Sequence, residues 1–428
     1  MPTPLRLGIA GLGTVGAGVV KIVQQDAALL AARAGRPIEI SAVSARNRSR
    51  DRGVDVGGYA WMDDPVALAS RDDVDLVVEL MGGSDGPAKA TVEAAFARGR
   101  DVVTANKAML ALHGQALAEM AEAAGAALRF EAAVAGAIPC VKVLLEGLAG
   151  NRIERVAGVM NGTCNYILTR MESAGLPYDA VFREANDLGY LEADPTLDVG
   201  GIDAGHKLAL LAAIAFGTRV DFNGVRLEGI DRITIEDITR AADMGYKIKL
   251  LGVAQVTGRG LEQRMTPCLV PATSPLGQLD GATNMVVFEG AASGQIVLRG
   301  AGAGEGPTAS AVIADIVDIA RGVRLPAFGQ PASTLAAPTP AQAGTPAPYY
   351  LRLELSDKPG ALARIASVLG DAGISINRMR QYGHADAAAP VLIVTHKTSR
   401  EALDFAIDRF AATGVLEADP VAIRIEAV

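Results

Sequence analysis

The chain has 428 residues, of which 50% are hydrophobic and 21% charged, and its formal net charge at pH 7 is −8. This size and composition are typical of a globular protein with two or three domains, and the negative charge disfavours nucleic acid and anionic membranes as partners. The cysteines, Cys140, Cys164 and Cys268, form no CxxC or Cys/His cluster and so predict neither a disulfide framework nor a structural metal. The N-terminus lacks a signal-peptide pattern and no apolar run has membrane-spanning length, which predicts a cytoplasmic protein.

The first third of the chain alternates short apolar strands with Ala-rich helices. A strand at 5–10 is followed by a glycine-rich turn and then by apolar residues at helical spacing over 17–33. Further strands are expected at 37–45, 73–82 and 99–107. Strands that alternate with helices predict a parallel, doubly wound sheet of the α/β class.

The glycine-rich turn contains a G-x-G-x-x-G motif between the predicted strand and helix. In a dinucleotide-binding domain the first glycine permits the tight turn, the second lets the backbone approach the pyrophosphate, and the third lets the helix pack closely on the strand. The alternative is a glycine turn without a ligand. We predict that the whole turn binds the cofactor through Gly11, Leu12, Gly13, Thr14, Val15 and Gly16.

Two positions at later strand ends bear on the same cofactor. The second strand ends in Ser44-Ala45-Arg46-Asn47-Arg48, where the acidic residue expected for NAD is missing. Arg46 suits a 2′-phosphate and predicts a preference for NADP, with a solvated basic turn as the alternative. Thr104 and Lys107 end a later strand and are expected to bind the cofactor in the crevice, because ligands lie at the carboxyl ends of strands in such sheets. An ordinary exposed lysine is the alternative.

After about residue 135 the pattern changes. The segments become longer and more apolar, which indicates a second, α+β domain. Residues 325–348 are rich in Pro, Ala, Gly and Thr and predict a semi-extended linker. The remainder, 349–428, has the pattern strand, helix, strand, strand, helix, strand of a ferredoxin-like unit.

The richest candidate site lies between 189 and 207. Asp203 and Lys207 are four residues apart at the start of an apolar helix and therefore share one face. This helix is too apolar for the surface, and charges beside a core need partners or a ligand. The segment predicts a zwitterionic substrate with a carbonyl group that receives a proton from the lysine. The alternative is an acidic helix start with a surface ion pair of little worth.

Taken together, these motifs resemble homoserine dehydrogenases. The resemblance covers residues 5–322 and includes the glycine-rich turn, the segment Thr104-Ala105-Asn106-Lys107, residues 158–166, and an A-x-x-x-G…D-P-x-x-D-x-x-G-x-D-x-x-x-K pattern over 185–207. Leu191 departs from the family, which has a small residue there, and bears on the packing of Glu192.

The resemblance implies reversible, NAD(P)H-dependent conversion of L-aspartate 4-semialdehyde to L-homoserine, in the biosynthesis of threonine, methionine and isoleucine. It implies that Lys207 donates the proton to the carbonyl oxygen and that Lys107 assists beside the nicotinamide. Gly304 is expected near the nicotinamide as well. Substrate binding is assigned to Glu192, Asp203, Asp198, Gly189 and Thr163.

The resemblance also implies a cation and a domain order. A sodium ion would be held by one carboxylate and three backbone carbonyls, from Glu131, Val134, Gly136 and Ile138. The implied domains are a Rossmann-type cofactor domain at 1–134, to which a helix near 305–322 returns, a catalytic and dimerisation domain at 135–304, the linker at 325–348 and an ACT domain at 349–428.

The last domain resembles an ACT regulatory domain through residues 357–362 and 374–377. We expect Asp357, Gly360 and Asn377 to bind an amino-acid effector, with threonine as the feedback inhibitor and a homodimer or tetramer as the assembly. A purely structural dimerisation module is the alternative.

Two other functions compete with this interpretation. A 2-hydroxyacid dehydrogenase with an ACT tail would need an Arg/Glu/His constellation, and the histidines His113, His206, His384 and His396 have no evident catalytic context. An NADP- and amino-acid-sensing regulator would not need the intact set of lysines and acids.

Overall fold

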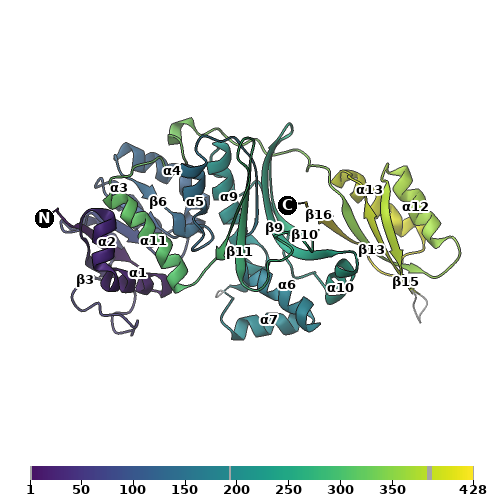
Figure 1. The fold of residues 1–428 in the computed structure, drawn as a ribbon, viewed down its shortest axis with the longest axis horizontal. Coiled ribbons are helices and arrows are strands. Elements are labelled where there is room, and N and C mark those ends of the chain that lie inside the picture. The colour runs from purple at the N-terminus through teal and green to yellow at the C-terminus, as the bar shows by residue number, and fades with distance from the viewer. Residues whose placement is uncertain (1, 192–193, 383–387, 428) are drawn as a thin grey trace.

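The computed structural model describes residues 2–191, 194–382 and 388–427. The chain forms a parallel sheet at its N-terminal end and a larger mixed sheet that runs from the middle of the molecule into the C-terminal domain (Figure 1). Within these ranges no single helix is long and apolar enough to cross a membrane, and the first two helices meet that test only as a pair bent by 84°.

The parallel sheet has the strand order β3-β2-β1-β4-β5-β6 of a dinucleotide-binding domain. Its strands are β1 (Leu5–Ala10), β2 (Ile38–Ser44), β3 (Ala60–Met62), β4 (Leu76–Glu79), β5 (Asp101–Thr104) and β6 (Leu128–Arg129). One face is covered by α1 (Thr14–Gln25), α2 (Ala27–Ala34) and α11 (Glu305–Ala320), and the other by α3 (Pro87–Phe96) and α4 (Lys107–Ala123). This arrangement confirms the predicted doubly wound α/β fold.

Side chains of the central strands alternate between two cores, because successive residues of a strand point to opposite faces. Val78 belongs to the core under α1 and α11, whereas Val77 and Val102 belong to the core under α3 and α4. The same alternation places Glu79 and Thr104, each two residues further along its strand, on the α4 side. Both are completely buried.

The helix predicted over 17–33 is two helices in the structure. Asp26 separates α1 from α2 with φ −109° and ψ 21°, outside the helical region. The backbone stays satisfied there, since the Asp26 N–H donates to the Ile22 carbonyl and the Asp26 carbonyl accepts from Leu30, each at 2.9 Å. The bend returns Leu30 and Ala34 to the core that α1 also covers, so an unbroken apolar pattern conceals a change of direction.

The mixed sheet begins in the second domain. Its strands there are β7 (Ile153–Val159), β8 (Val225–Leu227), β9 (Tyr246–Thr257), β10 (Gly260–Pro271), β11 (Thr283–Gly290) and β12 (Gly294–Ala301). The helices are α5 (Cys140–Lys142), α6 (Gly162–Ala174), α7 (Tyr178–Asp187), α8 (Pro195–Val199), α9 (Ile202–Phe216) and α10 (Ile235–Asp243). Helix α9 packs against β7, β9 and β10 on one side and α4 on the other (Figure 1). It therefore lies at the junction of the first two domains.

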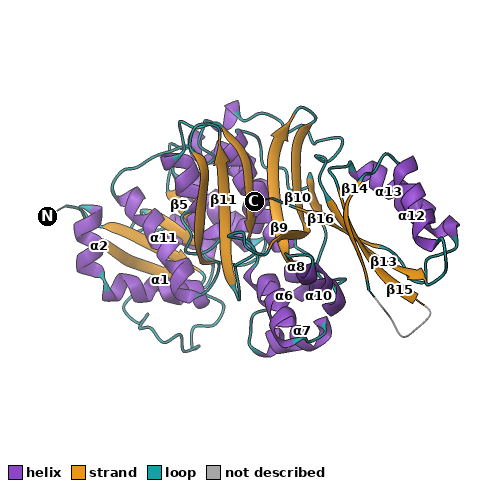
Figure 2. Cartoon of the chain, turned by 45° about the vertical axis from the view of Figure 1, so that its right-hand side comes forward, coloured by secondary structure: helices purple, strands orange, loops and turns teal. Residues whose placement is uncertain are grey.

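The C-terminal domain follows the predicted order of elements. These are β13 (Tyr349–Ser356), α12 (Ala361–Asp371), β14 (Ile376–Gln381), β15 (Ala388–Thr395), α13 (Arg400–Phe410) and β16 (Val421–Ile425). Strand β16 also pairs in parallel with β10, with Arg424 opposite Cys268 and Ile425 opposite Leu269. The second and third domains therefore share one sheet (Figure 2).

The segment 325–348 is more than a tether. Phe328 and Leu335 are 1% and 4% exposed and belong to the core of the first two domains. Leu261 at the start of β10 donates to Thr339 at 2.8 Å and accepts from Ala341 at 2.9 Å. The segment is thus a strap held by backbone bonds and isolated apolar anchors, which composition alone does not reveal.

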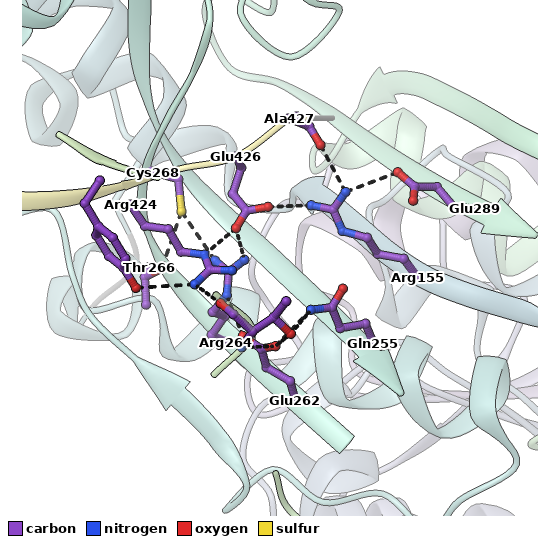
Figure 3. A network of polar contacts seen from close by, with 12 residues as sticks. Arg155, Gln255, Glu262, Arg264, Thr266, Cys268, Glu289, Arg424, Glu426 and Ala427 are labelled. Carbon is purple, nitrogen blue, oxygen red and sulfur yellow. Dashed lines mark hydrogen bonds and ion pairs between the residues drawn. The ribbon is translucent and has the colours of Figure 1, made fainter. Parts of the chain in front are cut away.

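A polar network joins the last strand to the second domain (Figure 3). Glu426 pairs with Arg264 of β10, with Arg424 of β16 and, at 2.7 Å, with Arg155 of β7. These four side chains are at most 13% exposed. Glu426 is thus shared by three guanidinium groups that are largely removed from water, and Glu262 and Glu289 pair in addition with Arg264 and Arg155, each at 3.2 Å.

Candidate active site

Two neighbouring clefts lie at the carboxyl ends of the parallel strands. The first, of about 650 Å³, is bordered by both domains and includes Lys107, Asp203 and Lys207. The second, of about 590 Å³, is bordered by the glycine-rich turn and the end of β2. The loop Leu80-Met81-Gly82 after β4 borders both. Since this is where doubly wound sheets bind ligands, the clefts form one candidate site.

The glycine-rich turn is shaped for close backbone approach. Gly11 has φ 102°, and a Cβ there would lie 2.6 Å from the Leu80 carbonyl oxygen. A Cβ on Gly16 would lie 2.0 Å from the Gly11 carbonyl oxygen, so only glycine fits. No heavy atom lies within 4 Å of a Cβ on Gly13, and α1 starts at the next residue. The turn therefore leaves room for a pyrophosphate at a helix N-terminus.

Arginines gather around the second cleft. Arg46, Arg50 and Arg52 line it, and Arg46 is exposed. Arg52 is held by the backbone, since its Nε donates to the Leu12 carbonyl at 3.1 Å. The cleft therefore offers positive charge where the ribose of a dinucleotide lies in this fold.

The first cleft contains a carboxylate between two ammonium groups. Lys207 Nζ lies 2.6 Å from Asp203 Oδ2 and donates to the Met160 carbonyl oxygen at 3.0 Å. Lys107 Nζ lies 2.8 Å from Asp203 Oδ1. Asp203 and Lys207 are 6% and 9% exposed. The pair is therefore buried at the head of α9, as its apolar sequence predicts, and is no surface ion pair.

Electrostatics hold Asp203 in its charged form. Burial alone would raise its pKa, but Lys207 and Lys107, by charge and by hydrogen bonds, bring the pKa of Asp203 well below the usual range. A permanently ionised carboxylate fixes both ammonium groups at the cleft. Lys107 begins α4 and Lys207 lies in α9, so the two domains meet at this carboxylate.

The other expected substrate residues surround this centre. Asp198 is 4% exposed and accepts a 2.9 Å bond from Asn161 Nδ2, and Asn161 Oδ1 caps α6. Thr163 and Gly189 line the cleft, and the Thr163 hydroxyl donates to the Tyr190 carbonyl at 2.8 Å. Gly304 lines it too. Glu192 lies outside the described residues, so its role stays a prediction.

Thr104 is placed differently from the expectation. Its side chain is completely buried, and its hydroxyl donates to Glu79 Oε2 at 2.5 Å. It borders neither cleft, whereas Ala105 and Lys107 border the first. Thr104 therefore lies behind the crevice wall, because the pleat of β5 turns its side chain toward α4.

The expected cation ligand Glu131 is buried with 2% exposure. Its carboxylate accepts backbone N–H bonds from Val141 at 2.9 Å and Lys142 at 2.7 Å. Burial, together with the charge of Asp315, raises the pKa of Glu131 to about 8. Lys142 offsets part of this negative charge, since its Nζ lies 3.3 Å from Asp315 Oδ1.

The three expected carbonyl ligands lie on the next turn. Ala135 and Gly136 reverse the chain there with φ 55° and 57°, and Ile138 donates to the Ala135 carbonyl at 3.1 Å. The Val134 carbonyl accepts a 3.4 Å contact from Cys140 Sγ. The described residues include no cluster of three or more His, Cys, Asp or Glu side chains that could hold a metal. A cation here would be bound mainly by backbone carbonyl oxygens, which hard cations accept as ligands.

The expected effector residues lie in the C-terminal domain. Asp357 and Gly360 are exposed before α12, and Gly360 has φ 86°. Asn377 is exposed on β14, with its Nδ2 3.5 Å from His396 Nε2. They border neither active-site cleft. Any effect they have on catalysis therefore has to act across the domain boundary.

Sequence reasoning missed the Met160 carbonyl, the Asn161 cap and Glu79. Met160 and Asn161 directly follow β7 and Glu79 ends β4, so polar groups at strand ends were the available signal. Nothing in the spacing showed that Lys107 and Lys207 would share one carboxylate.

Comparisons with known proteins agree with this architecture. The homoserine dehydrogenase NAD-binding domain model matches residues 11–131, the homoserine dehydrogenase model 139–317 and the ACT domain model 349–412. The homoserine dehydrogenase of Neisseria gonorrhoeae is 42% identical and that of Pseudomonas aeruginosa 40% identical, each over 99% of both chains. The crystal structure of a homoserine dehydrogenase from Thiobacillus denitrificans has 40% identity and a TM-score of 0.93, covering 99% of both chains. The cofactor domain, the cleft at its strand ends and these full-length similarities together establish that the chain belongs to the homoserine dehydrogenase family.

Proposed function

We propose that the protein reduces L-aspartate 4-semialdehyde to L-homoserine, reversibly, with NADPH as the preferred cofactor. The observation that supports this most directly is the Lys207 ammonium, held at the cleft by Asp203 and the Met160 carbonyl. A fixed ammonium beside the dinucleotide crevice is suited to a carbonyl oxygen that gains negative charge.

Three side chains divide the work at the reacting centre. The nicotinamide cofactor supplies the hydride when it is bound. Lys207 binds the carbonyl oxygen and gives it a proton as the alcohol forms, and the reverse reaction returns that proton. Lys107 stabilises the same developing charge from the cofactor side. Asp203 orients both ammonium groups, since each donates to a different carboxylate oxygen.

Further residues are proposed to bind the polar end of the substrate. Its ammonium group would be held by Glu192, and Asp198 would orient Asn161, which lines the cleft. Thr163 and Gly189 would shape the wall that encloses the amino acid. This division keeps one cluster of acids for recognition and one pair of lysines for chemistry.

A steady-state assay tests the function. With homoserine and NADP, absorbance at the nicotinamide band should rise at a rate proportional to enzyme, whereas L-serine, one methylene shorter, should give less than about a tenth of that rate. If neither homoserine oxidation nor aspartate 4-semialdehyde reduction were detected, the proposal would be refuted and a sensor without catalysis would be favoured.

We further propose that the Glu131 turn binds sodium through the Glu131 carboxylate and the carbonyls of Val134, Gly136 and Ile138. The support is the Glu131 carboxylate, which is 2% exposed and whose charge a cation would offset, while Lys142 pairs with the neighbouring Asp315 at 3.3 Å. In the same assay, replacing sodium with tetramethylammonium at equal ionic strength should lower the rate. An unchanged rate would count against the site.

The preference for NADP is proposed to rest on Arg46. Arg46→Ala should raise the KM for NADPH about tenfold and leave the KM for NADH nearly unchanged, because only the former carries the 2′-phosphate. Arg48→Ala is the matched control, since Arg48 lies on the same turn over the Trp61 ring and does not border the cleft. Equal kcat/KM for both cofactors in the parent enzyme would contradict the proposal.

Regulation by threonine is proposed to act through the C-terminal domain, in a cytoplasmic dimer or tetramer. The double variant Asp357→Ala/Asn377→Ala should raise the inhibition constant for threonine about tenfold. Each inhibition curve is normalised to the variant's own uninhibited rate, which separates effector binding from catalysis. Equal inhibition of parent and variant would leave the domain a structural module.

A further inference from the structure

Glu79 is a buried carboxyl group next to the cofactor crevice to which no role has been assigned. It ends β4 and is completely buried. The residues that follow it, Leu80 to Gly82, border both clefts. Burial raises its pKa to about 7, although bonds from Thr104, Met81 and Asn106 oppose the shift. Because burying an ionisable group costs free energy, a carboxyl group at this position of the sheet is expected to have a function.

The carboxyl group bridges two loops of the site. Glu79 Oε1 accepts the Met81 N–H at 2.7 Å, and Oε2 accepts the Thr104 hydroxyl at 2.5 Å. The Thr104 oxygen accepts the Asn106 N–H at 3.0 Å. Asn106 then donates from Nδ2 to the Gly83 carbonyl at 2.7 Å. These bonds tie the loop after β4 to the loop after β5.

Each tied loop presents a functional group. Asn106 Oδ1 caps α4, whose first residue is Lys107, so the chain fixes the start of the helix that carries this ammonium. The loop after β4 supports the glycine-rich turn, because Gly11 rests on the Leu80 carbonyl. Glu79 is thus linked to the pyrophosphate turn through Leu80, and to Lys107 through Thr104 and Asn106. It borders neither cleft itself.

The surroundings of Glu79 contain little opposing charge. Within the described residues no charged side chain contributes to its shift. Lys107, at the start of the adjoining helix, directs its ammonium to Asp203 at 2.8 Å. Strands β1 and β5 face Glu79 with Ala10 and Thr104. Glu79 therefore acts through its hydrogen bonds and its own ionisation.

We propose that Glu79 is a positioning residue that sets the distance between the nicotinamide and Lys107 by locking the loops after β4 and β5 together. The inference rests on the nicotinamide-dependent reaction proposed above. The ionised carboxylate accepts both bonds. When Glu79 is protonated, its O–H donates to the Thr104 oxygen, so the Thr104 hydroxyl rotates away and loses its acceptor, which loosens the lock.

The test uses the full-length enzyme and two measurements, NADPH affinity from fluorescence titration and kcat at saturating substrates. Glu79→Gln, which is isosteric, should weaken NADPH binding about fivefold and lower kcat about tenfold. Between pH 6 and 8 the parent should bind NADPH more tightly as pH rises through about 7, and the variant should lack that component. The 2′-phosphate titrates in both proteins, so the difference between the profiles isolates Glu79.

Thr104 supplies a second variant pair. Thr104→Val should reproduce the loss in kcat, and Thr104→Ser should keep kcat within about twofold of the parent value. Adding Thr104→Val to Glu79→Gln should lower kcat little further, because both substitutions act on the same Glu79–Thr104 hydrogen bond. Glu93→Gln is the matched control, as Glu93 pairs with Lys89 on α3. Variants with lower thermal stability but parental NADPH affinity, kcat and pH profile would overturn the inference. The binding titration needs no turnover, so its result stands even if the proposed substrate is wrong.

Discussion

Replacing Lys207 with alanine is expected to lower kcat by about 10³-fold while the dissociation constant for NADPH changes less than about threefold. The ammonium lies in the substrate cleft, 2.6 Å from Asp203 and 3.0 Å from the Met160 carbonyl. In the proposed mechanism, its loss removes both the proton donor and a positive charge that stabilises the transition state. The pyrophosphate turn lies in another domain and keeps its contacts.

Stopped-flow hydride transfer and NADPH fluorescence titration measure the two effects. Lys207→Arg separates proton donation from charge, because a guanidinium keeps the cation but holds its proton firmly. It should remain at least about 10²-fold impaired. Lys21→Ala is the control, since Lys21 is an exposed lysine of α1. Near-normal turnover of Lys207→Ala would exclude the lysine as the acid.

The second large effect is expected at Glu426. Glu426→Ala removes the carboxylate that Arg155, Arg264 and Arg424 share in a region largely removed from water, although Glu289 and Glu262 still pair with the first two. Removing one partner of a buried ion pair typically costs about 3–5 kcal/mol. We therefore expect the C-terminal domain to detach locally before the rest unfolds, since β16 pairs with β10 over only two residue pairs.

Hydrogen exchange resolves this effect by segment. Amides of β16 and of the strap should exchange at least about 10²-fold faster in Glu426→Ala, and those of the parallel sheet should not change. Glu426→Gln keeps one acceptor oxygen, so its amide exchange rates in β16 should lie between those of the parent and those of Glu426→Ala. Glu417→Ala, an exposed glutamate of the same domain, is the control. If the amides of β16 and the strap exchanged at the same rate in the parent and in all variants, the network would add nothing to the attachment of the C-terminal domain.

Local sequence periodicity predicted much of this molecule. The i, i+4 spacing of Asp203 and Lys207 in an apolar helix indicated a buried pair, and their Nζ to Oδ2 distance is 2.6 Å. The glycine motif between strand and helix indicated the dinucleotide turn. Both are local features, in which a few neighbouring residues determine the geometry.

The features that sequence missed depend on distant segments. Lys107 meets Asp203 only because α4 packs against α9. Thr104 turns away from the crevice because the pleat of β5 faces it to Glu79. The strap owes its position to isolated anchors such as Phe328, which form no periodic pattern. Tertiary contacts decide each of these, and spacing along the chain does not contain them.

The junction of β10 with β16 limits how the C-terminal domain can move. A rigid-body rotation of that domain has to bend β10 or break the short ladder between Cys268–Leu269 and Arg424–Ile425. Strand β10 lies against α9, the helix that carries Asp203 and Lys207. We therefore expect small torsions of the C-terminal domain to reach the residues of α9 that line the cleft, and large torsions to break the ladder. The β10–β16 junction is thus expected to couple the two domains only for motions small enough to leave its two residue pairs intact.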